Sequence, residues 1–512
     1  MTVLAIDAGT TGVTALMVTA EGSVAGRGYQ EFRQYFPQPG WVEHLPESIW
    51  QATLAACSQA LAAAGGQESR PAVSCVGITN QRETAVVWDR ATLAAPRRAI
   101  VWQDRRTAPI CDRLRAAGAE PRVSELTGLR LDPYFTATKL TWLAENDPSV
   151  WAGVTDGSLA VGTVDAYLIA RLTGGRRQVC DASNASRTLL FDIEAGQWSA
   201  ELCELFGVPP HALPEVVPST GVAGHTDPAA FLGLSVPVAG IAGDQQAALF
   251  GQACFAPGTA KCTYGTGSFV LANTGPSIVR SSVGLLSTVA WLEPSGELTY
   301  ALEGSVFVTG AAIQWLRDGL GLLDNAAQSE ALARSVPDSG GVVFVPALTG
   351  LGAPDWDPAA RGAMFGLTRG TTRAHLIRAA LEAIAFEVRD VYDLMAEPIA
   401  AIDTGNGSVS SPGSTSPRSR PALRVDGGAS ANGLLLQLQA DQLQIPVERP
   451  VVAETTALGA AFLAGLAVGE WSGTRELAAT WQLDERFIPA ARQDGDYARW
   501  RKAVERTKGW AH

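Results

Sequence analysis

Lysine is nearly missing from this 512-residue chain, which has only Lys139, Lys261, Lys502 and Lys508. None of the four follows a glycine, so the Gly-Lys-Ser/Thr string of a Walker P-loop is absent and that large class of nucleotide-binding proteins is excluded. Acidic residues number 51 and basic residues 39, which gives a net charge of −12. We therefore expect no nucleic-acid partner held by a basic surface, and no polybasic anchor or other insertion into a membrane.

Paired cysteines, clustered histidines and long apolar runs are also missing. The 7 cysteines include no Cys-x-x-Cys and the 5 histidines no His-x-x-His, which argues against a zinc site or a disulfide framework. Scattered cysteines and a start without a basic leader predict a reduced, cytoplasmic protein with buried thiols. The uncharged run Thr455–Gly469 is shorter than the ~18–20 residues of a membrane span. We expect it to be a buried helix whose small residues pack closely on a neighbour.

The length predicts two domains, because a single core stops growing near roughly 250–300 residues. An apolar strand, a glycine turn and a return strand occur at Val3–Val18, with a third strand from Val24, which indicates an antiparallel meander. The same unit recurs at Thr259–Leu271, so we expect two related halves, residues 1–248 and 249–512. Ser, Gly, Pro and Thr dominate Thr404–Arg420, which predicts a mobile surface loop near 404–420.

Helices are predicted by periodicity and by their start and stop signals. Proline suits a first helical turn, so one helix should begin near Pro46. Further predicted helices are Val161–Leu172, Val306–Leu320 and Arg373–Met395, and one from near Ala429.

Glycine turns after buried strands are the first candidates for chemistry. At Asp7-Ala8-Gly9-Thr10-Thr11 the backbone could approach a phosphate, and Asp7 could hold a metal ion, usually through water for Mg²⁺. A tight hairpin turn without a ligand is the simpler alternative. The turn Gly265-Thr266-Gly267 could approach a phosphate in the same way, or be a plain hairpin turn. Two such turns favour a nucleotide phosphate held between the domains. Asp426-Gly427-Gly428 could receive a base or ribose, or form a plain strand-to-helix turn.

Two further strand ends carry charged residues. Asp244 follows a predicted strand, where its carboxylate could accept a hydroxyl proton or act only as a helix cap, and the helix dipole should then keep its pKa low. Arg82 and Glu83 could together hold two vicinal hydroxyls, or form a solvated turn pair. By base rate Trp102, Tyr134 and Phe269 would be core aromatics.

Six strings resemble a known family over nearly the whole chain, from about Val3 to about Val504. They are Pro39–His44, Ile78–Thr84, Asn184–Arg187, Gly240–Gly251, Thr263–Gly267 and Gly350–Asp357. They closely resemble the glycerol kinases of the FGGY carbohydrate kinase family, the Gly-Leu-Gly-Ala-Pro-x-Trp-Asp string marking that family broadly. The resemblance implies an α/β fold of two ribonuclease-H-like domains of the actin/hexokinase type, with the active site in the cleft between them.

The resemblance also implies an activity and a set of site residues. ATP would phosphorylate glycerol to glycerol 3-phosphate, with Asp244 as the base and Asp7 and Asp244 organising Mg²⁺. The polyol would be held by Arg82, Glu83, Trp102, Tyr134, Asp244, Gln245 and Phe269. The nucleotide would be held by Thr10, Thr11, Thr266, Gly310, Gln314, Gly428 and Asn432. Members of the family are usually homodimers or homotetramers.

Three departures from the family pattern affect these expectations. Ala8 and Thr14 stand where glycerol kinases commonly have glutamine and arginine, and an arginine near the transferred phosphoryl would stabilise its charge. Val222–Val236 has neither arginine nor lysine and carries Ala230, so control by fructose 1,6-bisphosphate or by a phosphorylated histidine should be absent. The segment 404–420 resembles an insertion.

Two other functions stay open. The chain could be an FGGY kinase for a longer polyol or a pentulose, although Arg82, Glu83, Trp102 and Tyr134 together fit a three-carbon polyol. It could also be a polyol-binding relative that no longer catalyses, for which the Thr14 departure is the only support.

Overall fold

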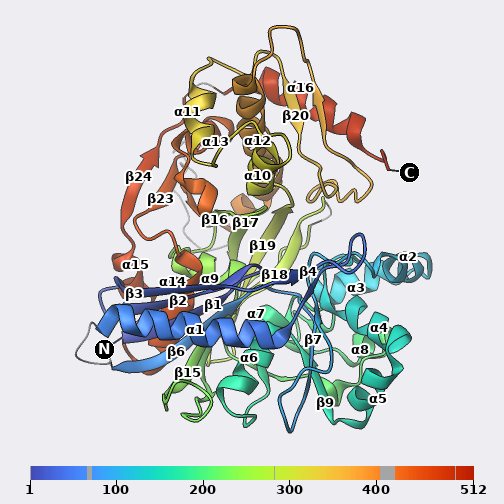
Figure 1. Ribbon diagram of the computed structural model, residues 1–512, viewed down its shortest axis with the longest axis vertical. Helices are drawn as coiled ribbons and strands as arrows, with labels where there is room; N and C mark the ends of the chain where they lie inside the picture. Colours follow the sequence, from blue (N-terminus) through green and yellow to red (C-terminus); the bar gives the residue numbers. More distant parts are fainter. Residues whose placement is uncertain (1, 66–71, 282, 404–420, 491, 512) are drawn as a thin grey trace, which may run out of the picture.

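Two large sheets organise the protein, one in each half of the computed structural model (Figure 1). The structure describes residues 2–65, 72–281, 283–403, 421–490 and 492–511. The predicted loop at 404–420 therefore lies outside the described residues. Among these residues, no helix has both the length and the apolar character needed to span a membrane.

The first sheet is mixed and carries the N-terminal meander. Its order is β14 (Thr220–His225), β15 (Pro237–Gly243), β6 (Val73–Asn80), β1 (Thr2–Ala8), β2 (Gly12–Thr19) and β3 (Val24–Glu31). β1 pairs antiparallel with β2, and β2 with β3, so the predicted meander is confirmed. β15, β6 and β1 run parallel, which brings their carboxyl ends to one edge of the sheet.

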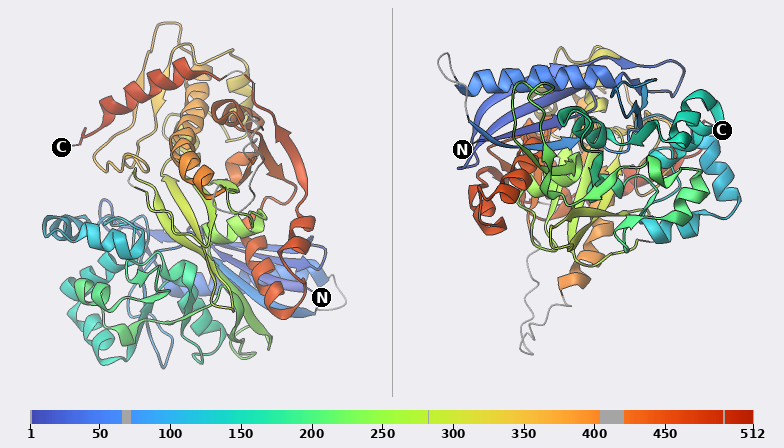
Figure 2. Two further views of the ribbon diagram at one scale, coloured as in Figure 1. Left: turned by 180° about the vertical axis from the view of Figure 1, so that it is seen from behind. Right: turned by 90° about the horizontal axis from the view of Figure 1, so that it is seen from below.

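Helices α1 and α6 cover one face of this sheet (Figure 2). Alternate residues of β1 point to opposite faces, so Leu4 and Ile6 join the core beneath α1, while Val3 and Ala5 join the core of α9 and α14. The helices of this half are α1 (Pro46–Gly65), α2 (Ala108–Ala116), α3 (Glu120–Thr127), α4 (Thr136–Asn146), α5 (Pro148–Asp156), α6 (Val164–Leu172), α7 (Ala182–Ala185), α8 (Ala200–Phe206), the 3₁₀ turn η1 (Pro210–Ala212) and α9 (Asp244–Gly251).

The second sheet repeats the theme in the other half of the chain. Its order is β18 (Leu286–Leu292), β19 (Leu298–Val306), β17 (Ser268–Gly275), β16 (Ala260–Tyr264), β22 (Leu423–Asp426), β23 (Val447–Pro450) and β24 (Leu483–Phe487). β16 and β17 pair as an antiparallel hairpin, which confirms the second predicted strand–glycine-turn–strand unit. The helices here are α10 (Gly310–Asp318), α11 (Gln328–Arg334), α12 (Arg373–Asp403), the 3₁₀ turn η2 (Gly428–Ala431), α13 (Gly433–Leu443), α14 (Thr455–Val468), α15 (Thr474–Thr480) and α16 (Asp494–Thr507).

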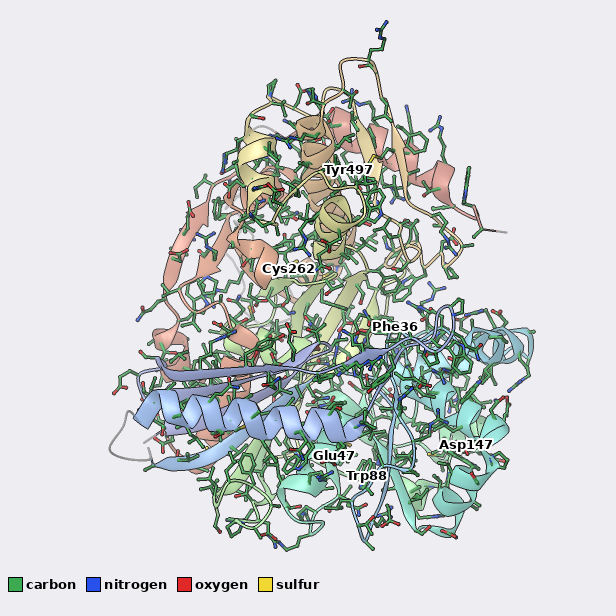
Figure 3. All side chains as sticks on the ribbon, viewed as in Figure 1. Phe36, Glu47, Trp88, Asp147, Cys262 and Tyr497 are labelled. Atoms are coloured by element: carbon green, nitrogen blue, oxygen red, sulfur yellow. The ribbon has the colours of Figure 1, made fainter. Side chains whose placement is uncertain are left out.

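Short strand pairs extend both halves. They are β4 (Gln34–Tyr35), β5 (Glu43–His44) and β8 (Ala99–Ile100); β7 (Val86–Asp89) with β9 (Leu159–Gly162); β10 (Val179–Asp181) with β13 (Glu215–Val217); β11 (Phe191–Asp192) with β12 (Gln197–Trp198); and β20 (Val343–Val345) with β21 (Ala363–Phe365). Trp88 and Cys262 mark the two buried interiors in Figure 3. All 7 cysteines are free and buried, as predicted.

Helices α9 and α14 share a core with both sheets. One hydrophobic cluster joins Val3 and Ala5 of β1 and Leu271 of β17 to residues of these two helices. The prediction of a buried helix at Thr455–Gly469 is confirmed, and its small residues do permit close packing. A Cβ on Gly459 would lie only 1.8 Å from the carbonyl oxygen of Ala247 in α9, so the two backbones touch there.

Two predicted helices begin later than expected because a strand takes their first residues. Ala160 and Val161 pair with β7, so α6 begins at Val164 rather than at Val161. Similarly, β19 extends through Val306, and α10 begins only at Gly310 after Thr309 N donates to the carbonyl of Thr266. Apolar residues fit either element, and only the pairing partner decided between them.

The segment Gly350–Asp357 contacts the last helix, α16, through charged side chains. Asp355 accepts from Lys508 (2.7 Å) and Arg501 (3.3 Å), and Arg501 also contacts Asp390 of α12 (2.7 Å). Glu387, one turn earlier on α12, is buried and its Oε2 has no hydrogen-bond partner among the described residues. Burial, reinforced by the charges of Asp390 and Asp355, raises the pKa of Glu387 well above its ordinary value.

Replacing Glu387 by glutamine should weaken the pH dependence of stability. A carboxyl group with a raised pKa holds its proton in the folded state to a higher pH than in the unfolded chain, so the free energy of unfolding falls as pH rises above about 4.5. The neutral amide removes this contribution, and at pH 5 the two proteins should differ by less than about 1 kcal/mol. Urea unfolding from pH 5 to pH 8 measures the effect, with Glu204→Gln on the exposed side of α8 as the control. Parallel pH profiles for wild type and Glu387→Gln would contradict it.

Candidate active site

Three neighbouring strands end at the same edge of the first sheet, and each delivers a charged group there. β1 supplies Asp7, the residues after β6 are Arg82 and Glu83, and β15 leads directly into Asp244, the first residue of α9. The carboxyl edge of parallel strands is where α/β proteins place their ligands. Residues far apart in the sequence thus meet at one site, as the resemblance implied.

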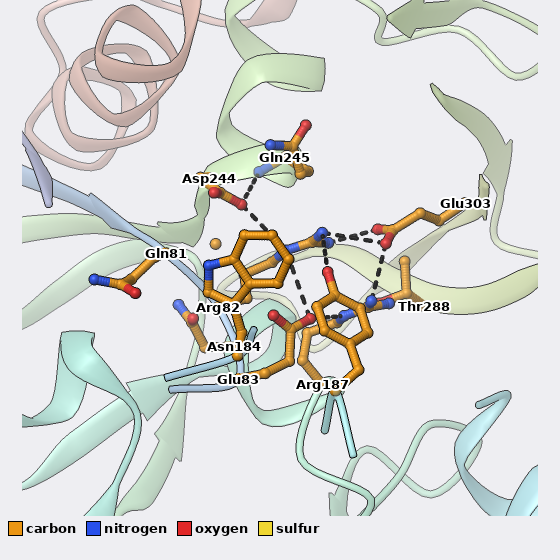
Figure 4. A network of polar contacts seen from close by, with 12 residues as sticks. Gln81, Arg82, Glu83, Asn184, Arg187, Asp244, Gln245, Thr288 and Glu303 are labelled. Carbon is orange, nitrogen blue, oxygen red and sulfur yellow. Dashed lines mark hydrogen bonds and ion pairs between the residues drawn. The ribbon is translucent and has the colours of Figure 1, made fainter. Parts of the chain in front are cut away.

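Arg82 is the centre of this site and is 2% exposed (Figure 4). Its Nε lies 3.1 Å from Asp244 Oδ1 and its NH2 donates to the hydroxyl of Tyr134 at 3.3 Å. Both terminal nitrogens donate to Glu303, at 2.5 Å and 3.1 Å, in a bidentate pair. A side chain held at so many points has its orientation fixed before any ligand arrives.

Glu303 and Arg187 are site residues that sequence reasoning missed. Glu303 lies on β19 of the second sheet and reaches the guanidinium groups of Arg82 and Arg187, the latter at 2.9 Å. Arg187 also donates to Glu83 at 2.7 Å, so two arginines and two glutamates form one buried network. Burial alone would raise the pKa of Glu303, but the charges of Arg187 and Arg82 outweigh it and lower this pKa to about 2. Arg187 lies in the string Asn184–Arg187 used for the resemblance, which was the available signal.

Asp244 faces the site with a carboxylate that is 27% exposed, while Arg82 beside it is buried. The prediction that a helix dipole keeps its pKa low is wrong. Burial raises the pKa of Asp244, although the charges of Arg82 and Lys261 oppose that shift. Desolvation therefore outweighs the opposing charges at this helix start.

Aromatic rings wall the space next to Arg82. Trp102 meets Tyr134 edge-on with ring centroids 5.6 Å apart and Phe269 with centroids 6.3 Å apart. The guanidinium of Arg82 lies 5.7 Å from the centroid of the Phe269 ring. Phe269 comes from β17, so both sheets contribute to the wall. The three rings form one group beside Arg82, and Tyr134 is at the same time a buried core residue, as predicted.

The first glycine turn lies beside the same space. Thr10 Oγ1 accepts a hydrogen bond from the Trp102 indole at 3.0 Å, and Gln81 Nε2 donates to the carbonyl of Gly9 at 3.0 Å. Thr11 is exposed. Burial and the charge of Asp244 together raise the pKa of Asp7 to about 7, which shows that the two carboxylates sense each other. Thr14, where the family commonly has arginine, lies directly across the β1–β2 pair from Asp7.

A separate pocket of about 440 Å³ lies in the second half of the chain. Five of the residues predicted to contact a nucleotide line it: Thr266, Gly310, Gln314, Gly428 and Asn432. Ile313, Leu381, Ile384 and Leu435 add an apolar wall suited to a flat ring. Thr10 and Thr11 are not part of this lining and stay with the first turn. The β16–β17 hairpin joins the two regions, because its turn enters the pocket and Phe269 faces Arg82.

Backbone groups at the mouth of this pocket are open. No atom of the described residues lies within 4 Å of where a Cβ would stand on Gly428, so a ligand can approach that peptide closely. Asn432 caps α13 by accepting from Leu435 N at 3.0 Å, which explains its place without a ligand, and its Nδ2 donates to Ser329. Among the described residues no group of three or more His, Cys, Asp or Glu side chains could hold a metal ion by itself.

Comparison with known proteins identifies the family. The family models for the N-terminal and C-terminal domains of the FGGY family of carbohydrate kinases match residues 2–251 and 260–468. The chain belongs to the FGGY family of carbohydrate kinases. Among FGGY relatives, the glycerol kinases of Symbiobacterium thermophilum and Aromatoleum aromaticum are 53% and 54% identical to it, each over 99% of both chains.

A solved FGGY structure gives the same fold. The crystal structure of Plasmodium falciparum glycerol kinase with ADP is 33% identical, covers 99% of this chain and 98% of its own, and superposes with a TM-score of 0.86. The predicted two-domain α/β FGGY fold is therefore confirmed. The site described above lies where the two sheets of that fold meet.

Proposed function

We propose that this protein transfers the γ-phosphoryl group of ATP to glycerol, giving sn-glycerol 3-phosphate. One observation carries the proposal. The predicted polyol set, Arg82, Glu83, Trp102, Tyr134, Asp244 and Phe269, converges on one space, in a chain that aligns end to end with proteins named glycerol kinase. Gln245 follows Asp244 on α9 and completes the set.

The polyol is held by groups whose positions are already fixed. Arg82 and Glu83 bind the hydroxyl groups of the polyol, and the rings of Trp102 and Phe269 contact its carbon chain. The reacting hydroxyl donates to Asp244, which accepts its proton as the oxygen attacks the γ-phosphorus in line. The bond between that phosphorus and the β–γ bridging oxygen breaks, and ADP is the leaving group. The raised pKa of Asp244 suits a base that receives this proton late, because little proton transfer is needed before the new P–O bond forms.

The ring-lined space favours a short polyol over a pentulose. Trp102 stands within 5.6 Å of Tyr134 and 6.3 Å of Phe269, measured between ring centroids, so the rings close one end of the space. The network of Glu303, Arg187 and Glu83 closes the floor with charged groups that are already paired.

The nucleotide and its metal ion fit the remaining residues. The adenine and ribose occupy the pocket lined by Thr266, Gly310, Gln314, Gly428 and Asn432, and the turn at Thr10 and Thr11 faces the phosphates. Asp7 and Asp244 offer hard oxygen donors, and two carboxylates plus substrate phosphates are the usual Mg²⁺ environment. When bound, Mg²⁺ neutralises charge on the transferring phosphoryl group. Asp7 and Asp244 would hold the ion, most simply through water.

Several finer statements belong to the same proposal. We place the domain boundary between residues 248 and 249, inside α9 and close to the interval between the two family models, which match residues 2–251 and 260–468. Seven buried free thiols support a cytoplasmic location. We propose a homodimer or homotetramer, and no control through fructose 1,6-bisphosphate or phosphohistidine, because 222–236 carries no lysine or arginine.

The decisive experiment measures ADP release from Mg-ATP with glycerol, erythritol, xylulose and no polyol. Turnover that depends on glycerol supports the proposal and shows that Thr14 is tolerated. Preference for xylulose or erythritol would overturn the substrate while keeping the kinase. Thermal protection by glycerol without turnover would instead favour a binding relative that lost catalysis.

A further inference from the structure

Two of the four lysines of this chain are completely buried, and one of them lies behind the reacting end of the site. Lys261 stands on β16 with 0% of its surface exposed. Its neighbours Ala260 and Cys262 join the core beneath α12, so Lys261 points to the opposite face, toward α9. Burial lowers the pKa of Lys261, and the charge of Asp426 opposes that shift.

The ammonium group uses all three of its hydrogens inside the protein. It donates to Gln245 Oε1, to Thr263 Oγ1 at 2.8 Å and to the carbonyl of Phe269 at 3.4 Å. No carboxylate contacts it directly among the described residues. A buried cation that is hydrogen-bonded only to neutral groups costs stability, because no anion directly offsets its desolvation.

The contact with Lys261 fixes the orientation of the side-chain amide of Gln245. An ammonium has donors only, so the oxygen of the Gln245 amide must face Lys261 and the Nε2 group must point the other way. Within the described part of the chain, Nε2 makes no hydrogen bond to protein. Gln245 directly follows Asp244, whose carboxylate accepts from the Gln245 backbone at 2.7 Å (Figure 4).

We propose that Lys261 is a positioning residue that locks the Gln245 amide with its Nε2 donor toward the polyol. Asp244 then offers an acceptor and Gln245 a donor at adjacent positions. The site therefore gives two oxygens of the ligand different roles. One donates its proton to Asp244, and the other accepts a hydrogen bond from Gln245. Without Lys261 the amide can turn over and present its oxygen instead. This inference rests on the proposed function only for the identity of the ligand.

A double-mutant cycle in the full-length protein tests this. Lys261→Met keeps the length of the side chain and removes the donor, and should raise the KM for glycerol roughly tenfold, the size expected for one lost hydrogen bond to a fixed donor. The KM for ATP should stay within about twofold, and Lys502→Met on exposed α16 should match wild type. In the Gln245→Ala background, Lys261→Met should no longer change the KM for glycerol, because Lys261 acts through that amide.

An equal rise in the glycerol KM in both backgrounds would overturn the proposal, and so would no rise in either. Gln245→Glu is a second test that needs no turnover. Its carboxylate gains an ion pair with Lys261, so its Tm should equal or exceed that of wild type, whereas binding of glycerol should weaken because the donor is gone. A lower Tm would contradict the contact itself. Failure of wild type to use glycerol would refute the proposed substrate, but would leave the Tm comparison decisive for Lys261.

Discussion

Asp244→Asn should lower kcat for glycerol by roughly 10²- to 10⁴-fold, the range for loss of a positioned general base. Asparagine has nearly the same shape and keeps an oxygen 3.1 Å from Arg82 Nε, so the site should stay assembled. The nucleotide pocket is lined by other residues, and we expect the affinity for ADP to be unchanged. Steady-state kinetics and ADP titration measure the two quantities.

The control for this variant is Asp112→Asn, which makes the same change on an exposed residue of α2. It should leave kcat and the affinity for ADP as in wild type. Turnover of Asp244→Asn within about threefold of wild type would exclude Asp244 as the base. Loss of ADP binding would show instead that the variant disturbs the second half of the site.

Glu303→Gln should lower the free energy of unfolding by about 3–5 kcal/mol. The reason is that Arg82 and Arg187, both buried, would lose the carboxylate that pairs with both of them. The glutamine can accept from one guanidinium but cannot neutralise Arg82 and Arg187 together. Since Arg82 then loses its bidentate anchor, the KM for glycerol should rise as well. Urea unfolding and polyol kinetics measure these two effects.

The compensating variant Arg187→Met with Glu303→Gln removes one charge of each sign. Its loss of stability should be smaller than the sum of the two single losses, because neither partner is left buried alone. Additive losses would mean that the contact at 2.9 Å contributes no coupling. If Glu303→Gln alone had the free energy of unfolding of wild type, Glu303 would not be a stabilising member of the network.

The role of Glu303 explains why the second half of the chain matters for the polyol side of the site. The carboxylate comes from β19, yet it holds Arg82, which follows β6 in the first half. Phe269 of β17 makes a similar crossing by standing over the same guanidinium. A movement of one sheet relative to the other would therefore displace groups at the proposed polyol site, because Glu303 and Phe269 of the second sheet contact Arg82 there.

Local patterns were enough to predict much of this protein. Period-two apolar strands and glycine turns fix the two hairpins, because each side chain must alternate between the faces of a sheet. Asp7, Arg82 and Asp244 became candidates because they stand at predicted strand ends, and the resemblance to the family supplied their expected roles. Scarce lysine and no Gly-Lys-Ser/Thr ruled out a P-loop from composition.

Only the tertiary structure decided the partners of these residues. Glu303 reads as one polar residue in an apolar strand, and Lys261 as another, until the second sheet is placed against α9 and β6. The pKa of Asp244 is also raised rather than lowered, because desolvation by the folded chain exceeds the opposing charges of Arg82 and Lys261. Sequence determines which groups are available, whereas burial and cross-sheet pairing, which depend on residues more than a hundred positions away, determine their charge and direction.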